Sequence, residues 1–120
     1  MSDVVFDTDV LVVGYGPVGA MAALLLGRAG VMVVDSRREI YPLPRAVAAD
    51  EEVLRMLSAA GLQHAVADML PNCGAQFVDR SGRTMLRIRL RDSDSGLPAL
   101  ALFRQPTLES TLRATERRSM

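Results

Sequence analysis

The chain opens with two short apolar runs that flank a segment of helical periodicity. Residues 8–13 form a nearly continuous run of apolar and β-branched side chains, typical of a strand buried on both faces of a parallel sheet. Between Pro17 and Ala29 apolar residues recur at helical spacing, and Gly30 stands where a glycine would end the helix. The recurring apolar residues are Val18, Met21, Ala22, Leu25 and Leu26. Residues 31–34 predict a second buried strand, so residues 8–35 predict a βαβ unit with a right-handed crossover.

The middle of the chain predicts a loop followed by two helices. Two prolines between Tyr41 and Arg45 favour an extended path. An amphipathic helix is expected to begin at Ala49 or Asp50, with acidic residues in its first turn and Gly61 just beyond its end. Its apolar side chains are Val53, Leu54, Met56 and Leu57. A further short helix is expected within residues 62–70.

The last third of the chain predicts a β-hairpin, a strand and a helix. Residues 76–79 and 84–90 flank the turn sequence Arg80-Ser81-Gly82-Arg83, which favours a hairpin. Residues 99–103 predict a short strand, and Pro106 suits the first turn of a final helix. The expected α/β architecture thus has three parts: the βαβ unit (8–35), the helices and hairpin (49–90), and the strand and final helix (99–118).

A glycine-rich turn follows the first predicted strand. Gly14-Tyr15-Gly16-Pro17-Val18-Gly19 fits the G-x-G-x-x-G pattern of dinucleotide-binding turns. Gly14 would permit the tight turn, Gly16 would let the backbone approach a pyrophosphate, and Gly19 would let the helix pack closely on the strand. The helix that begins near Pro17 would point its N–H groups and positive dipole end at the phosphates. Because a strand precedes the turn and a helix follows it, we predict a Rossmann-like dinucleotide site here.

Asp35 follows the second predicted strand, about twenty residues beyond the glycines, as the dinucleotide pattern requires. Its carboxylate would accept hydrogen bonds from the hydroxyls of the adenosine ribose. The same carboxylate would repel a 2′-phosphate in that place. Asp35 therefore favours FAD or NAD over NADP at this site.

Composition narrows the classes of partner. The chain carries 14 basic and 14 acidic side chains, so it has no overall field that would hold nucleic acid or an anionic membrane. Cys73 is the sole cysteine, which excludes an internal disulfide and a thiolate metal cluster within one chain. The apolar run at residues 10–13 is too short to span a bilayer, and no basic segment precedes it. We expect a cytoplasmic protein that binds neither nucleic acid nor membrane.

Several residues of types that often act in catalysis or binding are not assigned a functional role. His64 has no second histidine or cysteine beside it to complete a metal site, and Cys73 lies in a loop with no sign of activation. The methionines at core-like positions are expected to pack: Met21, Met56 and Met69. The interleaved arginines are expected on the outward face of a strand: Arg87, Arg89 and Arg91. No catalytic residue and no metal ligand is predicted.

The sequence resembles the FAD-dependent aromatic-ring monooxygenases, in the branch of the phenol and 3-hydroxyphenylpropionate hydroxylases. Three stretches carry the resemblance: residues 9–30, residues 41–57 with Pro44-Arg45-Ala46 and Asp50-Glu51-Glu52-Val53-Leu54-Arg55, and Phe103-Arg104-Gln105-Pro106-Thr107-Leu108-Glu109. The resemblance implies that Arg45 lies against the FAD pyrophosphate, where a guanidinium offers several fixed donors. It also implies that Gln105 contacts the flavin region. Ser36 and Arg37, beside Asp35, are also expected to contact the cofactor. The predicted cofactor-binding residues are therefore Gly14, Gly16, Pro17, Val18, Gly19, Asp35, Ser36, Arg37, Arg45 and Gln105.

The resemblance also implies the chemistry of the family. NADH or NADPH would reduce the FAD, and the reduced flavin would use O₂ to hydroxylate a phenolic ring. In that scheme the cofactor carries the reaction, while the protein positions it.

The chain departs from the family pattern in two ways. The segment between Gly30 and Asp35 is about two residues shorter than usual, which puts the pairing of the second strand in doubt. The chain also lacks the family's later flavin contact and its substrate domain. We therefore expect an N-terminal part of the FAD-binding domain that is inactive alone, with sheet edges that favour self-association.

Two other functions would also explain the glycine pattern and Asp35. One is the nucleotide-binding domain of an NAD-dependent dehydrogenase, which would have no need of Arg45 and Gln105. The other is a dinucleotide-binding module without catalysis, which the short length favours. A bound flavin, and oxidation of NAD(P)H stimulated by phenols, would separate the three.

Overall fold

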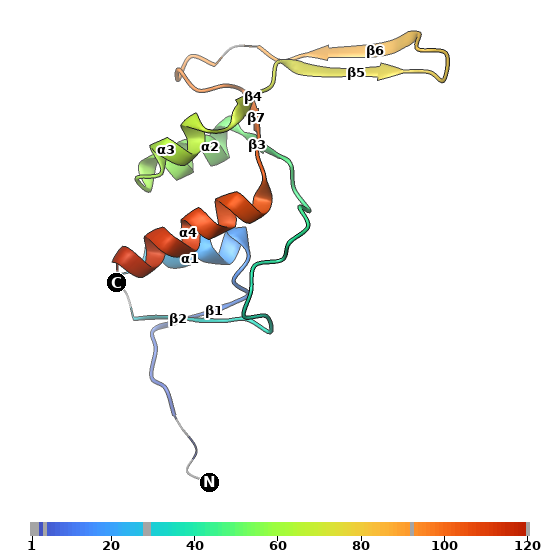
Figure 1. Ribbon diagram of the computed structural model, residues 1–120. Helices are drawn as coiled ribbons and strands as arrows, with labels where there is room; N and C mark the ends of the chain where they lie inside the picture. The colour runs from blue at the N-terminus through green and yellow to red at the C-terminus, as the bar shows by residue number, and fades with distance from the viewer. Residues whose placement is uncertain (1–2, 4, 28–29, 92, 120) are drawn as a thin grey trace. The chain divides into compact units, whose positions relative to one another are not determined.

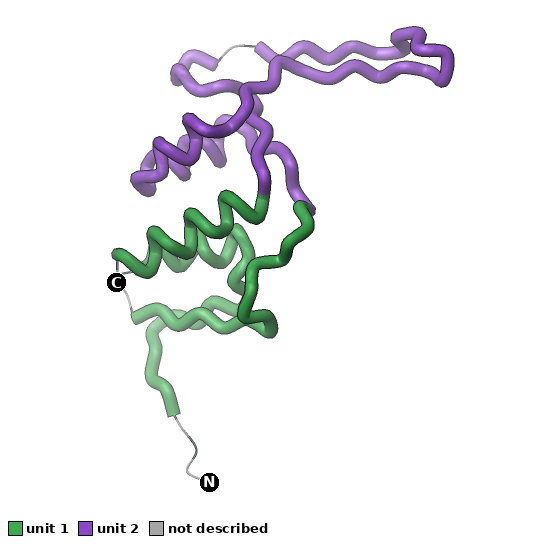
Figure 2. The backbone as a smooth tube through the Cα atoms, in the orientation of Figure 1, with its two compact units in different colours: residues 1–44, 105–120 green, residues 45–104 purple. Residues whose placement is uncertain are grey.

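The computed structural model describes residues 3, 5–27, 30–91 and 93–119 (Figure 1). The chain divides into two compact units, coloured separately in Figure 2. Unit 1 contains residues 1–44 and 105–120, and unit 2 contains residues 45–104. Both units combine helices with strands, which confirms the predicted α/β class.

Unit 1 contains the predicted βαβ unit and the final helix. Its elements are β1 (Val10–Val13), α1 (Pro17–Leu26), β2 (Val31–Val34) and α4 (Gln105–Ser119). β1 and β2 run parallel and pair residue by residue, from Val10 opposite Val31 to Val13 opposite Val34. The short connection before Asp35 therefore does not disturb the pairing of β2 along its length.

The prediction that β1 is buried on both faces is wrong. Val10 and Val12 are half-buried, whereas Leu11 and Val13 are 54% and 79% exposed. Side chains alternate between the two faces of a strand, and Val12 lies on the face that α1 approaches at Gly19. Among the described elements α1 packs against this two-stranded sheet, and the face opposite α1, which carries Leu11 and Val13, stays open.

Helix α1 ends earlier than predicted. It finishes at Leu26 with Gly27 as its C-cap, whereas Arg28 and Ala29 lie outside the described residues. Gly30 is therefore not the capping residue; it has φ +36° and its carbonyl accepts the N–H of Asp9 at the start of the sheet. The buried side chains of α1 are Ala20, Met21 and Ala23, and α1 lies along α4 (Figure 1). Val18, in the first turn of α1, is 83% exposed.

Unit 2 contains a three-stranded antiparallel sheet in the order β3-β7-β4. The strands are β3 (Ala48–Asp50), β7 (Leu100–Leu102) and β4 (Leu70–Pro71), and two helices accompany them: α2 (Glu51–Ala59) and α3 (Gln63–Ala67). Strand β7 and both helices were predicted with slightly longer bounds. Strands β3 and β4 were not predicted, since each consists of two or three residues paired to the distant β7.

The start of α2 follows from its sequence. Asp50 is the N-cap, and its carboxylate accepts the N–H of Val53 at 3.0 Å. Leu54 and Leu57 are buried, whereas Met56 is 44% exposed, so the expectation that Met56 packs in the core is wrong. Met21 and Met69 are buried as expected.

The predicted hairpin is confirmed as β5 (Gly74–Val78) and β6 (Thr84–Arg89). Phe77 lies opposite Leu86, and Gln76 lies opposite Arg87, with a register shift after Phe77. Residues directly opposite one another share a face, so Arg87 lies on the face away from Phe77 and donates to Gln76 at 3.2 Å.

Candidate functional site

The turn between β1 and α1 shows why two of its three glycines are required. Gly14 has φ +104°, a conformation that side chains rarely adopt. Its N–H donates to the carbonyl of Val34 at 2.7 Å, which ties the turn to the end of β2. A Cβ on Gly19 would lie 1.9 Å from the carbonyl oxygen of Gly14, so only glycine lets the helix come this close. Both structural roles predicted for these glycines are present.

Gly16 differs from its neighbours because the fold does not require a glycine there. Its φ is −76°, and a Cβ built on it would meet no atom of the described chain within 4 Å. Gly16 is also the N-cap of α1, whose first turn carries no acidic side chain and begins with Pro17. The open space therefore adjoins the positive end of a helix, which is the geometry that a phosphate group needs.

Asp35 joins this turn to the segment after β2. One carboxylate oxygen accepts the N–H of Tyr15 and the other accepts the N–H of Arg37 at 2.7 Å. These two backbone donors, Tyr15 first, hold the pKa of the Asp35 carboxyl below its ordinary value, with smaller contributions from the charges of Arg113 and Arg37. Each oxygen keeps a further lone pair, so the exposed carboxylate can still accept a ribose hydroxyl.

The lowered pKa predicts a dependence of stability on pH. Because the folded chain favours the charged form of Asp35, its contribution is fully present above the unfolded pKa of about 3.9 and is lost as the pH falls through the lower folded value. Urea denaturation of the parent and of Asp35→Asn should therefore differ at pH 6 and converge as the pH is brought below the folded value. A difference that does not change with pH would contradict this assignment.

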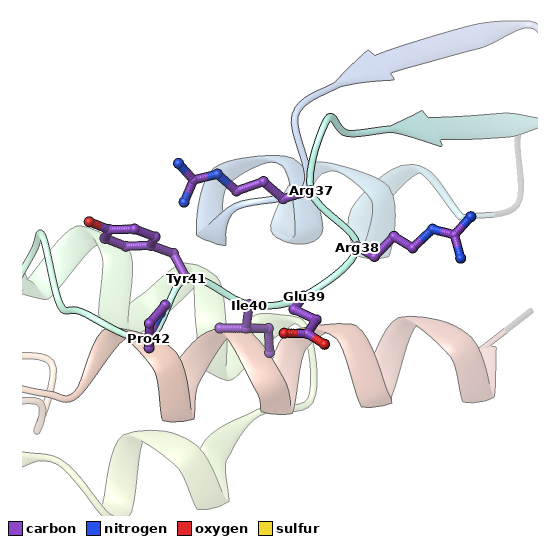
Figure 3. Close-up of a pocket in the computed structure, with 6 residues that line it drawn as sticks. All are labelled: Arg37, Arg38, Glu39, Ile40, Tyr41 and Pro42. Atoms are coloured by element: carbon purple, nitrogen blue, oxygen red, sulfur yellow. The ribbon is translucent and has the colours of Figure 1, made fainter.

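The segment after Asp35 forms a shallow pocket (Figure 3). Its lining residues are Arg37, Arg38, Glu39, Ile40, Tyr41 and Pro42. The guanidinium of Arg37 lies 4.8 Å from the centre of the Tyr41 ring, and both side chains project to the same side of the loop, whereas Arg38 points away from them. The backbone N–H of Arg37 binds Asp35, and Ser36 is exposed between the two residues.

Helix α4 contributes a buried polar cluster that the sequence interpretation missed. Glu109, Arg113 and Glu116 are 3%, 6% and 5% exposed. Arg113 pairs with Glu109 at 2.7 Å and donates to the main-chain carbonyl of Tyr15, and the Tyr15 hydroxyl donates to Glu116 at 2.8 Å. Burial first, and then the bond to Glu116, raises the pKa of Tyr15. A signal was present, because these residues share one helical face with Leu108 and Leu112.

The two residues assigned through the family resemblance lie in different units. Arg45 is exposed at the start of unit 2, on the loop that leads to β3. Gln105 is buried at the first position of α4 in unit 1. Contact of either side chain with a cofactor remains a prediction.

Neither a metal-binding cluster nor a membrane-spanning helix occurs in the described part of the chain. It contains no group of three or more histidine, cysteine, aspartate or glutamate side chains that could hold a metal ion. Among the same residues, no helix has the length and apolar character needed to cross a bilayer.

Comparison with characterised proteins identifies relatives along nearly the whole chain. The 3-(3-hydroxy-phenyl)propionate/3-hydroxycinnamic acid hydroxylase of Mycobacterium sp. (strain JLS) is 38% identical over 111 residues, which are 90% of this chain and 20% of the relative. The enzyme of the same description from Comamonas testosteroni is 38% identical over 109 residues, 88% of this chain and 18% of its own length. The chain thus spans about a fifth of the length of these relatives.

Solved structures show the same likeness. The p-nitrophenol 4-monooxygenase of Pseudomonas putida DLL-E4 matches 92% of this chain and 29% of its own, with a TM-score of 0.78 and 26% identity. Aklavinone-11 hydroxylase, solved with FAD and aklavinone, matches 98% of this chain and 25% of its own, with a TM-score of 0.74 and 27% identity. The family model described as an FAD binding domain matches residues 7–120. The chain, with its glycine turn, its Asp35 and its βαβ unit, therefore belongs to this family of FAD-binding domains.

Proposed function

We propose that this chain supplies the FAD-binding part of a flavin-dependent monooxygenase that hydroxylates phenolic compounds with NADH or NADPH and O₂. The observation that carries the proposal is the open space at Gly16, at the N-terminus of α1. The preceding residue, Tyr15, donates its N–H to the Asp35 carboxylate, so the open space and Asp35 are close together. The names of the relatives support the aromatic substrate class. Since the chain spans about a fifth of those relatives, hydroxylation is proposed for the whole protein and not for these 120 residues alone.

Different residues of unit 1 would bind different parts of the cofactor. The pyrophosphate would lie against Gly16 and the N–H groups of Val18 and Gly19, which have no partner within the first turn of a helix. Asp35 would accept a ribose hydroxyl, with Ser36 and Arg37 beside it. Once bound, FAD would supply the redox chemistry that no side chain of this chain can perform.

The remaining assigned residues would act from outside the glycine turn. The Arg45 guanidinium would add donors for a pyrophosphate oxygen, and Gln105 would contact the flavin region. We further propose a cytoplasmic location, for which the free thiol of Cys73 is suited. The open edges of the two-stranded sheet would favour self-association at high concentration.

Cofactor binding can be tested directly. The purified chain would be titrated separately with FAD and with NAD⁺, and binding followed by the flavin visible spectrum and by calorimetry. We expect FAD to bind more tightly, and equal or tighter binding of NAD⁺ would favour the dehydrogenase alternative. Phenol-stimulated oxidation of NADH or NADPH would then be measured with the full-length protein, because the chain itself is proposed to bind and not to hydroxylate.

Replacing Asp35 by alanine should weaken FAD binding. The loss should be about 1.5–3 kcal/mol, the range for a hydrogen bond to a charged group, because the ribose loses its acceptor. The substitution also releases the N–H groups of Tyr15 and Arg37. Calorimetric titration with FAD measures the loss, and Asp7→Ala, at an exposed position before β1, is the matched control. A change of only a few tenths of a kcal/mol would show that Asp35 does not reach the ribose.

A further inference from the structure

We propose that Arg113 of α4 is a positioning residue that holds the two loops of the proposed cofactor site in one arrangement, and this inference rests on the proposed function. Its guanidinium donates to the carbonyl of Tyr15 in the glycine turn and to the carbonyl of Arg38, at 3.5 Å, in the segment after Asp35. The two carbonyls lie in loops that follow different strands. One side chain therefore joins the turn proposed to hold the pyrophosphate to the loop proposed to hold the ribose.

The side chain of Arg113 is itself fixed on several sides. Glu109 pairs with it one helical turn earlier, at 2.7 Å, and the guanidinium lies 4.2 Å from the centre of the Tyr15 ring. The Tyr15 hydroxyl is bound by Glu116, which lies on the same face of α4. An arginine suits this place because its planar fork reaches two acceptors at a fixed angle, which a lysine ammonium cannot do.

The burial of this cluster argues for a role beyond packing. Taking charged side chains out of water costs free energy, and well-packed apolar side chains often serve stability as well or better. The Nε–H of Arg113 is buried without a hydrogen-bond partner among the described residues, a further cost. The effect of the cluster is to fix the orientation of two backbone carbonyls, those of Tyr15 and Arg38.

The consequence for a ligand follows from the planarity of the peptide bond. The peptide between Tyr15 and Gly16 is trans, like every peptide bond among the described residues, so the Gly16 N–H points opposite to the Tyr15 carbonyl. Arg113 holds that carbonyl, while Asp35 holds the N–H of Tyr15. The Gly16 N–H is thereby directed away from Arg113, and the Tyr15 backbone is fixed on both sides.

Two variants remove the contacts of Arg113 with the two loops while avoiding an unpaired buried charge. Arg113→Lys keeps a positive charge for Glu109 but loses the fork, and the double variant Glu109→Gln with Arg113→Met removes both charges together. Arg118→Lys, at an exposed position of the same helix, is the matched control. FAD affinity, the urea midpoint, and the pH titration of the Tyr15 and Arg37 amide signals by NMR would be measured for each.

We expect both Arg113 variants to bind FAD at least tenfold more weakly under conditions where each is fully folded. In Arg113→Lys the Asp35 carboxyl, followed through the Tyr15 and Arg37 amides, should titrate at a higher pH than in the parent. The control should match the parent in both respects. A lower urea midpoint with unchanged FAD affinity and unchanged Asp35 titration would overturn the proposal, since Arg113 would then serve stability alone. If the parent itself binds no FAD, the proposed function fails, and the amide titration still decides the role of Arg113.

Discussion

Replacing Gly19 by alanine should unfold or severely destabilise the βαβ unit. The new Cβ would lie 1.9 Å from the carbonyl oxygen of Gly14 and 2.9 Å from its carbon, both of them backbone atoms that no rotamer change can move. Relief requires α1 to withdraw from the turn, which would break the Gly14 N–H bond to Val34 or open the α1–β1 contact. We expect a loss of about 3 kcal/mol or more, at the upper end for overpacking substitutions.

The measurement is urea denaturation followed by circular dichroism, with Gly16→Ala as the matched control. Both variants add one methyl group within the same turn. At Gly16 the added Cβ meets no described atom within 4 Å, so its effect should stay below about 1 kcal/mol, the scale of an unfavourable N-cap residue. Equal stability of the two variants would show that α1 can move away from the turn without penalty.

The features of unit 1 that depend on local backbone geometry could be predicted from the sequence. A glycine with positive φ at position 14, a helix that starts at Pro17, and a carboxylate directly after β2 are each specified by a few neighbouring residues. The same holds for α2, where Asp50 caps the helix and Gly61 follows it with φ +83°. Such features follow from short-range chemistry, so a single sequence indicates them.

Features that depend on distant partners could not be predicted in this way. Strands β3 and β4 have two or three residues and exist through pairing with β7, about 30 to 50 positions along the chain. The exposure of Leu11 and Val13 depends on what packs against their face of the sheet, which the apolar run alone does not specify.

In the candidate site, too, the features set by neighbouring residues could be predicted and those set by distant residues could not. Gly14, Gly16, Gly19 and Asp35 were found from their spacing, but the interactions of Asp35 with backbone N–H groups were not foreseen. Arg113 was missed because a charged residue on an apolar helical face interrupts the hydrophobic pattern by which such a face is recognised. Its partners Tyr15 and Arg38 lie 98 and 75 positions earlier in the chain, so no local pattern connects them.

Replacing Gly16 by valine should abolish FAD binding while the chain remains folded. A Cβ at Gly16 would meet no described atom within 4 Å, so the valine side chain would extend from open space into the region proposed for the pyrophosphate. We expect affinity to fall at least about a hundredfold, or about 2.7 kcal/mol, because the backbone N–H groups can no longer approach the phosphate oxygens.

The test compares FAD affinity with stability in the same variants. Ala59→Val, at the exposed end of α2, introduces the same residue type into a helix outside the proposed site and should leave affinity unchanged. The far-ultraviolet circular dichroism of Gly16→Val should match that of the parent, so that lost binding cannot be attributed to unfolding. If FAD affinity survives in a folded Gly16→Val, the pyrophosphate does not lie at this turn, and the glycine there must have another explanation.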